Sequence, residues 1–259
     1  MNNYSIIIST CDKFSDLWEH HLNFLIKNWR GELPKIYLVS DKESSFSFPN
    51  VIFLFFDGDF PERIKNACEL IDNEYIILTL DDYFLINETD ANRISFLVHY
   101  ARKESIDYLS LFSRRADKEK IIRPLEYFEP VNLSKKYAVN LYPAIWKRTF
   151  LIGCVRETGS PWSFEAGLSK IAFEENAKCY RNYSNSFKIL DVVRKGKLLR
   201  DANKYLIKNG IHLKRPLVPR KEEARLKIAD FVNWHTPMWF KKFCKKVAKG
   251  FGMKFYSDD

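Results

Sequence analysis

Two adjacent carboxylates, Asp81 and Asp82, directly follow an apolar stretch that is typical of a buried strand. The stretch runs from Tyr75 to Leu80 and reads YIILTL. Two carboxylates held side by side raise each other's pKa unless a cation is near, and carboxylate oxygens suit Mg²⁺ or Mn²⁺. Asp is also common where a strand turns, which explains one aspartate more easily than two. The pair therefore indicates a metal-binding or proton-transfer site, with a solvated turn as the alternative.

Three earlier segments of the chain also end on polar or acidic side chains. Segments 4–10, 35–41 and 50–59 read YSIIIST, KIYLVSD and NVIFLFFDGD, which predict strands. Segments 15–29 and 60–72 repeat apolar residues at helical spacing. Strands that alternate with such helices form a mainly parallel sheet covered on both faces, and ligands bind outside the carboxyl ends of its strands. We therefore expect one site that gathers the polar residues at the strand ends: Thr10, Cys11, Asp12, Ser40, Asp41, Asp57, Asp59, Asp81 and Asp82.

The rest of the chain adds further strands and helices before a basic end. Ser160 and Pro161 suit the N-cap and first residue of a helix, and Gly210 suits the end of another. No linker rich in Pro, Gly or Ser interrupts the chain. The sequence therefore predicts one α/β domain over residues 1–215 and a basic helical extension over residues 216–259.

Composition limits the class of protein. The chain has 259 residues, of which 46% are hydrophobic, and this is enough for a full core. No apolar run approaches the roughly 18 residues that span a bilayer, and the N-terminus lacks the basic region of a signal peptide. The five cysteines are far apart and have no metal-ligand spacing, which fits a reducing compartment. We therefore expect a cytoplasmic protein.

The basic charge is confined to the C-terminal quarter. Residues 188–256 contain 19 Lys and Arg against 5 Asp and Glu, whereas residues 1–187 contain 23 against 26. Within this quarter, residues 238–256 interleave aromatic side chains with lysines and contain no acid. This pattern predicts an amphipathic helix that binds the anionic inner face of the cytoplasmic membrane. The alternative is a helix that packs on its own domain and exposes its lysines to water.

Glycine-rich phosphate loops are missing from the sequence. No G-x-G-x-x-G follows the first strand, and no G-x-x-x-x-G-K-[ST] occurs anywhere. Their absence argues against dinucleotide oxidoreductases and P-loop NTPases. If phosphates are bound, a metal held by Asp81 and Asp82 must help to neutralise them.

Several short motifs, taken in order, resemble a known family. ISTCD, LVSD and ERIKNACELIDNEYIILTLDDYFL are similar to the nucleotide-sugar half of glycosyltransferases with the GT-A fold. With NLYPAIWKRTFL, ETGSPWSFE and VVRKGK, the chain resembles bacterial transferases that build capsule, lipopolysaccharide or O-antigen chains, over roughly residues 5–197. The resemblance implies an α/β, GT-A-like (Rossmann-related) fold. It also implies an inverting, metal-dependent transfer from a nucleoside-diphosphate sugar, with a UDP-sugar favoured, to a glycan or lipid-linked acceptor.

The resemblance also implies roles for individual residues. In such enzymes a D-x-D type motif binds the metal, Mn²⁺ or Mg²⁺, and the diphosphate; the match here is Leu80, Asp81 and Asp82, which lacks the first acid. Which aspartate touches the metal therefore stays open. The donor-binding residues that it implies are Thr10, Asp12, Asp41, Arg63, Asp81, Lys195 and Lys197. Asp12 equally fits an N-cap or turn, and for each lysine taken singly a solvated loop is the favoured alternative.

Glu165 and Trp162 provide a second group of candidates. Transfer with inversion needs a general base near the acceptor hydroxyl, and the carboxylate of Glu165 is suitable. The ring of Trp162 is suitable for stacking on an acceptor sugar. In the structural alternative, Glu165 completes a helix cap and Trp162 belongs to the core. A retaining enzyme would leave Glu165 with another role.

Two other classes compete with a glycosyltransferase. A metal-dependent nucleotidyltransferase also uses carboxylates on an α/β sheet, but it usually has a glycine-rich or basic loop after the first strand, which STCDKFSDLW is not. A non-enzymatic protein that binds nucleic acid or membrane would explain only the basic quarter. The neutral to acidic first 187 residues argue against a nucleic-acid partner.

Overall fold

The computed structural model describes residues 3–112, 128–156, 158–182 and 186–225. The chain divides into two compact units, Met1–Val192 and Val193–Asp259. This division lies before the boundary that the sequence predicts at residue 215.

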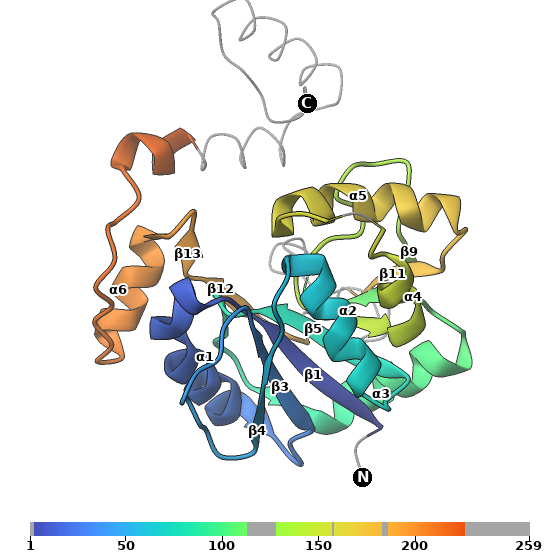
Figure 1. The fold of residues 1–259 in the computed structure, drawn as a ribbon, viewed down its shortest axis with the longest axis horizontal. Coiled ribbons are helices and arrows are strands. Elements are labelled where there is room, and N and C mark those ends of the chain that lie inside the picture. The colour runs from blue at the N-terminus through green and yellow to red at the C-terminus, as the bar shows by residue number, and fades with distance from the viewer. Residues whose placement is uncertain (1–2, 113–127, 157, 183–185, 226–259) are drawn as a thin grey trace, which may run out of the picture. The chain divides into compact units, whose positions relative to one another are not determined.

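The first unit is built on an eight-stranded sheet with the strand order β4-β3-β1-β5-β10-β8-β11-β9 (Figure 1). Its first four strands are parallel neighbours, at the positions that the sequence predicts: β4 (Val51–Phe55), β3 (Lys35–Ser40), β1 (Tyr4–Ser9) and β5 (Tyr75–Leu80). The next strand, β10 (Ala144–Lys147), runs antiparallel to both of its neighbours. Beyond it lie β8 (Tyr108–Ser110), β11 (Cys179–Asn182) and β9 (Phe128–Pro130). The sheet is therefore mixed, with a parallel half that carries the predicted strand ends.

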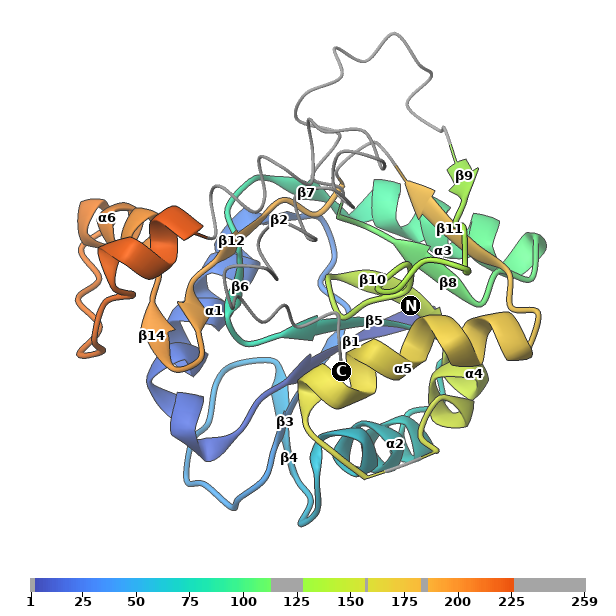
Figure 2. The same ribbon diagram turned by 90° about the horizontal axis from the view of Figure 1, so that it is seen from above.

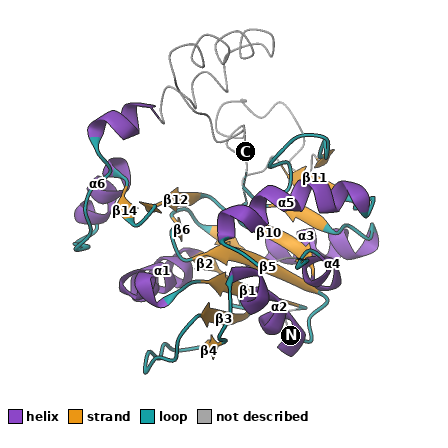
Figure 3. Cartoon of the chain, turned by 45° about the horizontal axis from the view of Figure 1, so that its top comes forward, coloured by secondary structure: helices purple, strands orange, loops and turns teal. Residues whose placement is uncertain are grey.

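Helices cover both faces of this sheet, as the alternation of strands and helices predicts (Figure 3). On one face, α1 (Ser15–Asn28) and α3 (Ala91–Lys103) pack on Ile6, Ile8 and Ile77. On the other face, the helices pack on Ile7, Ile76 and Leu78; they are α2 (Phe60–Leu70), α4 (Arg148–Gly153) and α5 (Pro161–Glu174). Successive strand residues point to opposite faces of the sheet, so each continuous apolar strand contributes side chains to the hydrophobic core on both faces.

The helix starts on the second face follow their sequence signals. Asp59 caps α2 in a reciprocal capping box with Glu62. Ser160 caps α5 by accepting a hydrogen bond from the backbone N–H of Ser163, and Pro161 is the first residue of that helix. Each such cap contributes about 1 kcal/mol to helix stability. These caps fix where α5, which carries Glu165, begins.

Short pairings that the sequence does not predict complete the first unit. Strand β6 (Tyr83–Leu85), directly after the acidic pair, pairs antiparallel with β12 (Ile189–Asp191). Strand β2 (Trp29–Arg30) pairs with β7 (Thr89–Asp90), and a 3₁₀ turn, η1 (Asp12–Phe14), precedes α1. The β6–β12 pair brings the end of the unit beside Asp82.

The second unit contains a hairpin and a helix. Strands β13 (Val193–Arg194) and β14 (Lys197–Leu198) are joined by Lys195 and Gly196, which both have positive φ angles, 51° and 76°. Such a turn needs a residue like glycine. The helix α6 (Arg200–Lys208) ends before Gly210 (φ +77°), as predicted. The basic segment 238–256 lies outside the described residues. Among the residues that the structure describes, no helix is long and apolar enough to cross a membrane.

Candidate active site

The predicted strand-end residues gather at the carboxyl edge of the parallel half-sheet, which Figure 2 shows from above. The backbone N–H of Thr10, after β1, donates to the carbonyl of Val39 in β3 at 2.9 Å. The N–H of Asp81, after β5, donates to the carbonyl of Ser9 in β1 at 3.3 Å. These hydrogen bonds extend the ladder past the strands and hold the three strand ends together, so the prediction that they converge is confirmed.

Asp81 and Thr10 form hydrogen bonds inside the unit. The hydroxyl of Thr10 donates to Oδ2 of Asp81 and accepts from Nε1 of Trp18 at 2.6 Å. All three side chains are buried. A buried carboxylate needs such donors, since losing one costs roughly 1.5–3 kcal/mol. Both residues thus stabilise the loop around the site, and their predicted contacts with a donor stay predictions.

His21 supports the same segment from α1. Its Nδ1 lies 3.0 Å from the carbonyl oxygen of Asp81, so the ring donates its Nδ1 proton to that carbonyl. Burial lowers the pKa of His21 to about 4, and the ring is therefore neutral near pH 7. Sequence reasoning missed both residues: helical spacing identifies Trp18 only as part of an apolar face, and His21 does not belong to that apolar pattern.

Asp82 is the more accessible member of the acidic pair. Its side chain is half-buried, and its backbone carbonyl accepts from the N–H of Val192 at 2.9 Å. The β6–β12 pairing places Asp191 opposite Tyr83, the residue next to Asp82. No sequence signal reveals Asp191, since its neighbourhood depends on a strand pairing across more than a hundred residues.

The carboxylates at this edge are the type of ligand that binds a hard divalent cation. Carboxylate oxygens are the ligands that Mn²⁺ and Mg²⁺ prefer, and Mg²⁺ commonly takes few protein ligands and completes its shell from phosphates and water. Within the described residues, no three His, Cys, Asp or Glu side chains are grouped closely enough to hold a metal by themselves. The predicted roles of Asp81 and Asp82 as metal ligands stay predictions, and Asp82 is the half-buried member of the pair.

Asp12 and Asp41 are connected across the ends of β1 and β3. The backbone N–H of Asp12 donates to Oδ1 of Asp41 at 2.6 Å, and Lys42 lies 3.3 Å from the Asp12 carboxylate. Asp12 begins the turn η1, whereas the N-cap of α1 is Phe14, which makes no side-chain capping bond. Asp12 therefore lies in a turn and is not an N-cap, and the predicted contacts of Asp12 and Asp41 with a donor stay predictions.

Arg63 is buried and joins two loops of the site. Its guanidinium donates to the carbonyls of Gly58 at 2.9 Å and Thr10 at 3.3 Å. A guanidinium that holds two backbone carbonyls fixes the loops after β4 and β1. Its predicted donor contact stays a prediction.

Glu165 does not cap its helix, because Ser160 does so. Instead, Oε1 of Glu165 accepts from the backbone N–H of Leu141 at 2.9 Å. Burial raises the pKa of the Glu165 carboxyl, and this hydrogen bond opposes the rise in part. Trp162 is 64% exposed, so the core explanation for that ring is also wrong. A carboxylate with a raised pKa is typical of a proton acceptor in catalysis.

Lys195 and Lys197 belong to the hairpin of the second unit. Lys195 is exposed in the turn and Lys197 is half-buried. Their predicted role as donor-binding residues stays a prediction.

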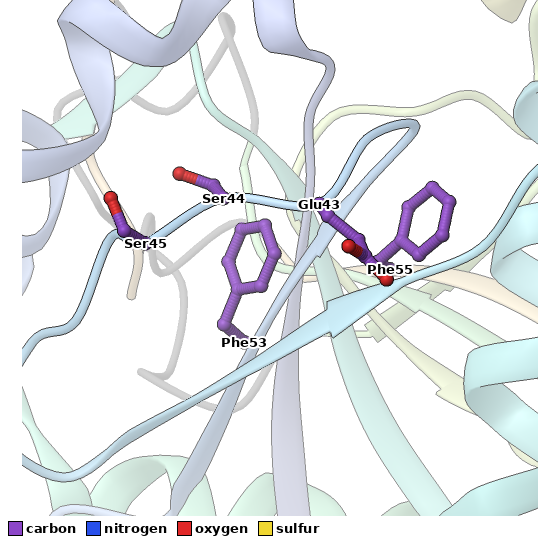
Figure 4. A pocket seen from close by; sticks show the side chains of 5 residues that line it. All are labelled: Glu43, Ser44, Ser45, Phe53 and Phe55. Atoms are coloured by element: carbon purple, nitrogen blue, oxygen red, sulfur yellow. The ribbon is translucent and has the colours of Figure 1, made fainter.

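A hollow of about 490 Å³ lies beside the β3–β4 edge (Figure 4). Its lining combines Phe53 and Phe55 of β4 with the segment from Glu43 to Ser45. The ring of Phe53 packs against Trp18 at 5.6 Å between centroids. None of the predicted site residues lines the hollow, although Trp18 connects it to the Thr10–Asp81 pair.

Comparison with known proteins decides the fold. The structure is similar to S. aureus TarS residues 1–349 in complex with UDP-GlcNAc, with a TM-score of 0.52 and 13% identity over 75% of this chain and 60% of that one. The fold is GT-A-like. Two further structures are less similar. Another structure of TarS 1–349 has a TM-score of 0.45 and 14% identity over 69% of this chain and 57% of that one. The mannosyltransferase PcManGT from Pyrobaculum calidifontis in complex with GDP-Man and Mn²⁺ has a TM-score of 0.47 and 12% identity over 80% of this chain and 60% of that one.

The chain thus spans at most about three fifths of the proteins it resembles. No family model and no curated protein sequence matches it. At these identities the likeness establishes the fold, and the predicted α/β, GT-A-like class is confirmed.

Proposed function

We propose that this chain is a glycosyltransferase that moves a sugar from a nucleoside-diphosphate donor to a hydroxyl group of a glycan acceptor. The observation that carries the proposal is the connection between Asp82 and Glu165 at the carboxyl edge of a GT-A-like sheet. Glu165 accepts a hydrogen bond from the N–H of Leu141, and the next residue, Tyr142, stacks on Tyr83, the residue that follows Asp82. A group that holds the donor and a group that accepts a proton are thus available at one edge of the sheet.

Asp82 would hold the donor through Mn²⁺ or Mg²⁺. When bound, the metal supplies Lewis-acid stabilisation of the departing diphosphate. Asp81, buried under Thr10 and His21, keeps the backbone of the pair in place so that the Asp82 carboxylate stays oriented. Arg63 fixes the loop that carries Thr10. A preorganised site of this kind lowers the cost of reorganisation during transfer.

Glu165 would accept the proton of the acceptor hydroxyl. As that oxygen forms its bond to the anomeric carbon, its proton passes to the carboxylate, and the bond to the diphosphate breaks with inversion. The Leu141 N–H orients the carboxylate. Burial of Glu165 raises its pKa and so makes it a stronger base than a solvated glutamate.

A UDP-sugar is the donor that we favour, since the similar TarS structure is a complex with UDP-GlcNAc. The acceptor that we favour belongs to capsule, lipopolysaccharide or O-antigen synthesis and is lipid-linked. A basic second unit supports attachment to the inner face of the cytoplasmic membrane, because residues 193–225 carry 11 Lys and Arg against 3 Asp and Glu.

The proposal is tested by titrating the protein with UDP, GDP and CMP, with and without Mn²⁺, and by measuring release of UDP from UDP-sugars. Asp82→Asn is expected to remove the metal-dependent part of binding and to lower turnover by about two orders of magnitude. The control is Asp72→Asn, because Asp72 is exposed and precedes β5 at the opposite end of that strand. Turnover in the Asp82 variant that equals that of the control would overturn the metal role.

Two other results would favour the competing classes. Pyrophosphate release from a nucleoside triphosphate would indicate a nucleotidyltransferase. Salt-sensitive binding of DNA without nucleotide-sugar binding would indicate a nucleic-acid-binding protein.

A further inference from the structure

Three aromatic rings form a row at the edge of the sheet, next to the acidic pair. The rings of Tyr83 and Tyr142 are stacked, with centroids 5.2 Å apart and an angle of 23° between their planes. The ring of Phe112 packs on Tyr142 at 5.0 Å with an angle of 38°. All three side chains are half-buried, so they remain partly accessible to solvent. We call these three residues the aromatic row.

The topology of the sheet explains why the rings meet. Tyr83 lies three residues after the end of β5, Phe112 lies two residues after the end of β8, and Tyr142 lies two residues before the start of β10. Because β10 runs antiparallel between β5 and β8, its start lies beside the ends of both neighbours. The three strands lie side by side in Figure 2. The row therefore continues the carboxyl edge that carries Asp82.

The row lies among the groups proposed for transfer. Tyr83 follows Asp82 and faces Asp191 across the β6–β12 pair. Tyr142 follows Leu141, whose N–H donates to Glu165. Three carboxylate residues are thus linked to the two stacked tyrosines: Asp82 by sequence, Asp191 by strand pairing and Glu165 through its hydrogen bond to Leu141.

The backbone around the row is held by several hydrogen bonds. Oγ of Ser169 accepts from the N–H of Val139 at 3.1 Å, which ties the segment before Tyr142 to α5. Oδ1 of Asn140 accepts from the N–H of Tyr142 at 3.1 Å. Oγ of Ser110 donates to the carbonyl of Phe112 at 2.8 Å. A backbone held in this way keeps the base of each ring in place, which lowers the entropy lost when a ligand binds.

We propose that the aromatic row binds a pyranose ring of the acceptor, so that the acceptor is a sugar and not a protein side chain or a simple lipid alcohol. The inference rests on the proposed function. A pyranose has a face of C–H groups that packs on an aromatic ring, while its hydroxyl groups reach toward carboxylates. The row offers such a face, and Asp191 and Glu165 offer the carboxylates. Glu165 then lies near the hydroxyl groups of the same sugar.

The test measures sugar binding separately from catalysis. Saturation-transfer NMR with a panel of methyl hexosides and methyl N-acetylhexosaminides, in the presence of UDP and Mn²⁺, reports which sugar protons lie against aromatic protons. Tyr142→Phe keeps the ring and is expected to bind as wild type does. Tyr142→Leu and Phe112→Leu keep apolar volume without a ring and are expected to bind roughly tenfold more weakly. Phe173→Leu is the matched control. Phe173 is a 66% exposed aromatic residue near the C-terminal end of α5, whereas Trp162 and Glu165 lie near the N-terminal end of that helix.

The outcomes separate this inference from the proposed function. If wild type binds UDP but no methyl glycoside, or if both leucine variants bind glycosides as the control does, the aromatic row is not the sugar platform. If Trp162→Leu alone removes glycoside binding, the platform is the exposed ring of Trp162 instead. If wild type binds no nucleotide in the calorimetric titration, the proposed function itself fails. Circular dichroism of each variant confirms that a loss is not unfolding.

Discussion

Replacing Thr10 with Val tests whether the acidic pair depends on the buried hydrogen bonds beneath it. The substitution keeps the shape of the side chain and removes only its hydroxyl. Nε1 of Trp18 would then be buried without its acceptor, and Asp81 would lose one donor. An orphaned buried donor costs about 1–3 kcal/mol and a hydrogen bond to a charged group about 1.5–3 kcal/mol. We therefore expect the free energy of unfolding to fall by about 3 kcal/mol or more.

The assay is urea unfolding followed by tryptophan fluorescence, with Thr10→Ser as the control that retains the hydroxyl. The serine variant is expected to lose about 1 kcal/mol or less, from its missing methyl group. Trp18→Phe removes the orphaned donor, so the double variant with Thr10→Val should lose less than the sum of the two single losses. A loss below about 0.5 kcal/mol in Thr10→Val, or strict additivity in the double variant, would refute the structural role that we assign to Thr10.

Two further predictions concern Glu165 and the basic segment. Burial raises the pKa of Glu165 above its ordinary value of 4.5, and a general base acts only when it is deprotonated. We therefore expect kcat/KM to fall as the pH drops through this raised pKa. A fall of kcat/KM only at or below pH 4.5, or the same fall in Glu165→Gln, would count against Glu165 as the base. Deleting residues 238–259 should release the protein from liposomes that contain anionic lipid while UDP binding persists. Undiminished sedimentation with the liposomes would discard the membrane role of that segment.

Local patterns predicted most of the first unit. The runs that become β1, β3, β4 and β5 are apolar and β-branched, and each is followed by a turn residue, so both their positions and their parallel direction were predictable, whereas their order in the sheet was not. The caps Asp59 and Ser160 act within a few residues of their helices. The sequence did not predict β6, because a three-residue strand is too short to show a pattern of its own and forms only by pairing with β12.

The sequence predicted the types of residue in the candidate site, but it did not predict which of them are buried and which contacts each one makes. Asp81 and Asp82 look alike in the sequence, yet one is buried beneath Thr10 and the other is half-buried. The sequence slightly favoured a catalytic role for Glu165 over a helix cap, and the structure excludes the cap, because Ser160 caps the helix and Glu165 contacts Leu141. His21 and Asp191 could not be assigned to the site, because each reaches it through a contact with a residue far away in the sequence. Trp18 contacts nearby Thr10, but its spacing indicates only a buried helix face.

The sequence by itself determined the alternation of strands and helices, the polar residues at the strand ends and the basic character of the last quarter, because these depend on spacing and composition along the chain. Only the tertiary structure decided which carboxylate is buried, which strands bring Asp191 to Asp82, and that Tyr83, Tyr142 and Phe112 lie in one row. The physical reason is that burial and hydrogen bonding at this edge are set by neighbours from distant segments, and those neighbours are fixed only when the sheet assembles.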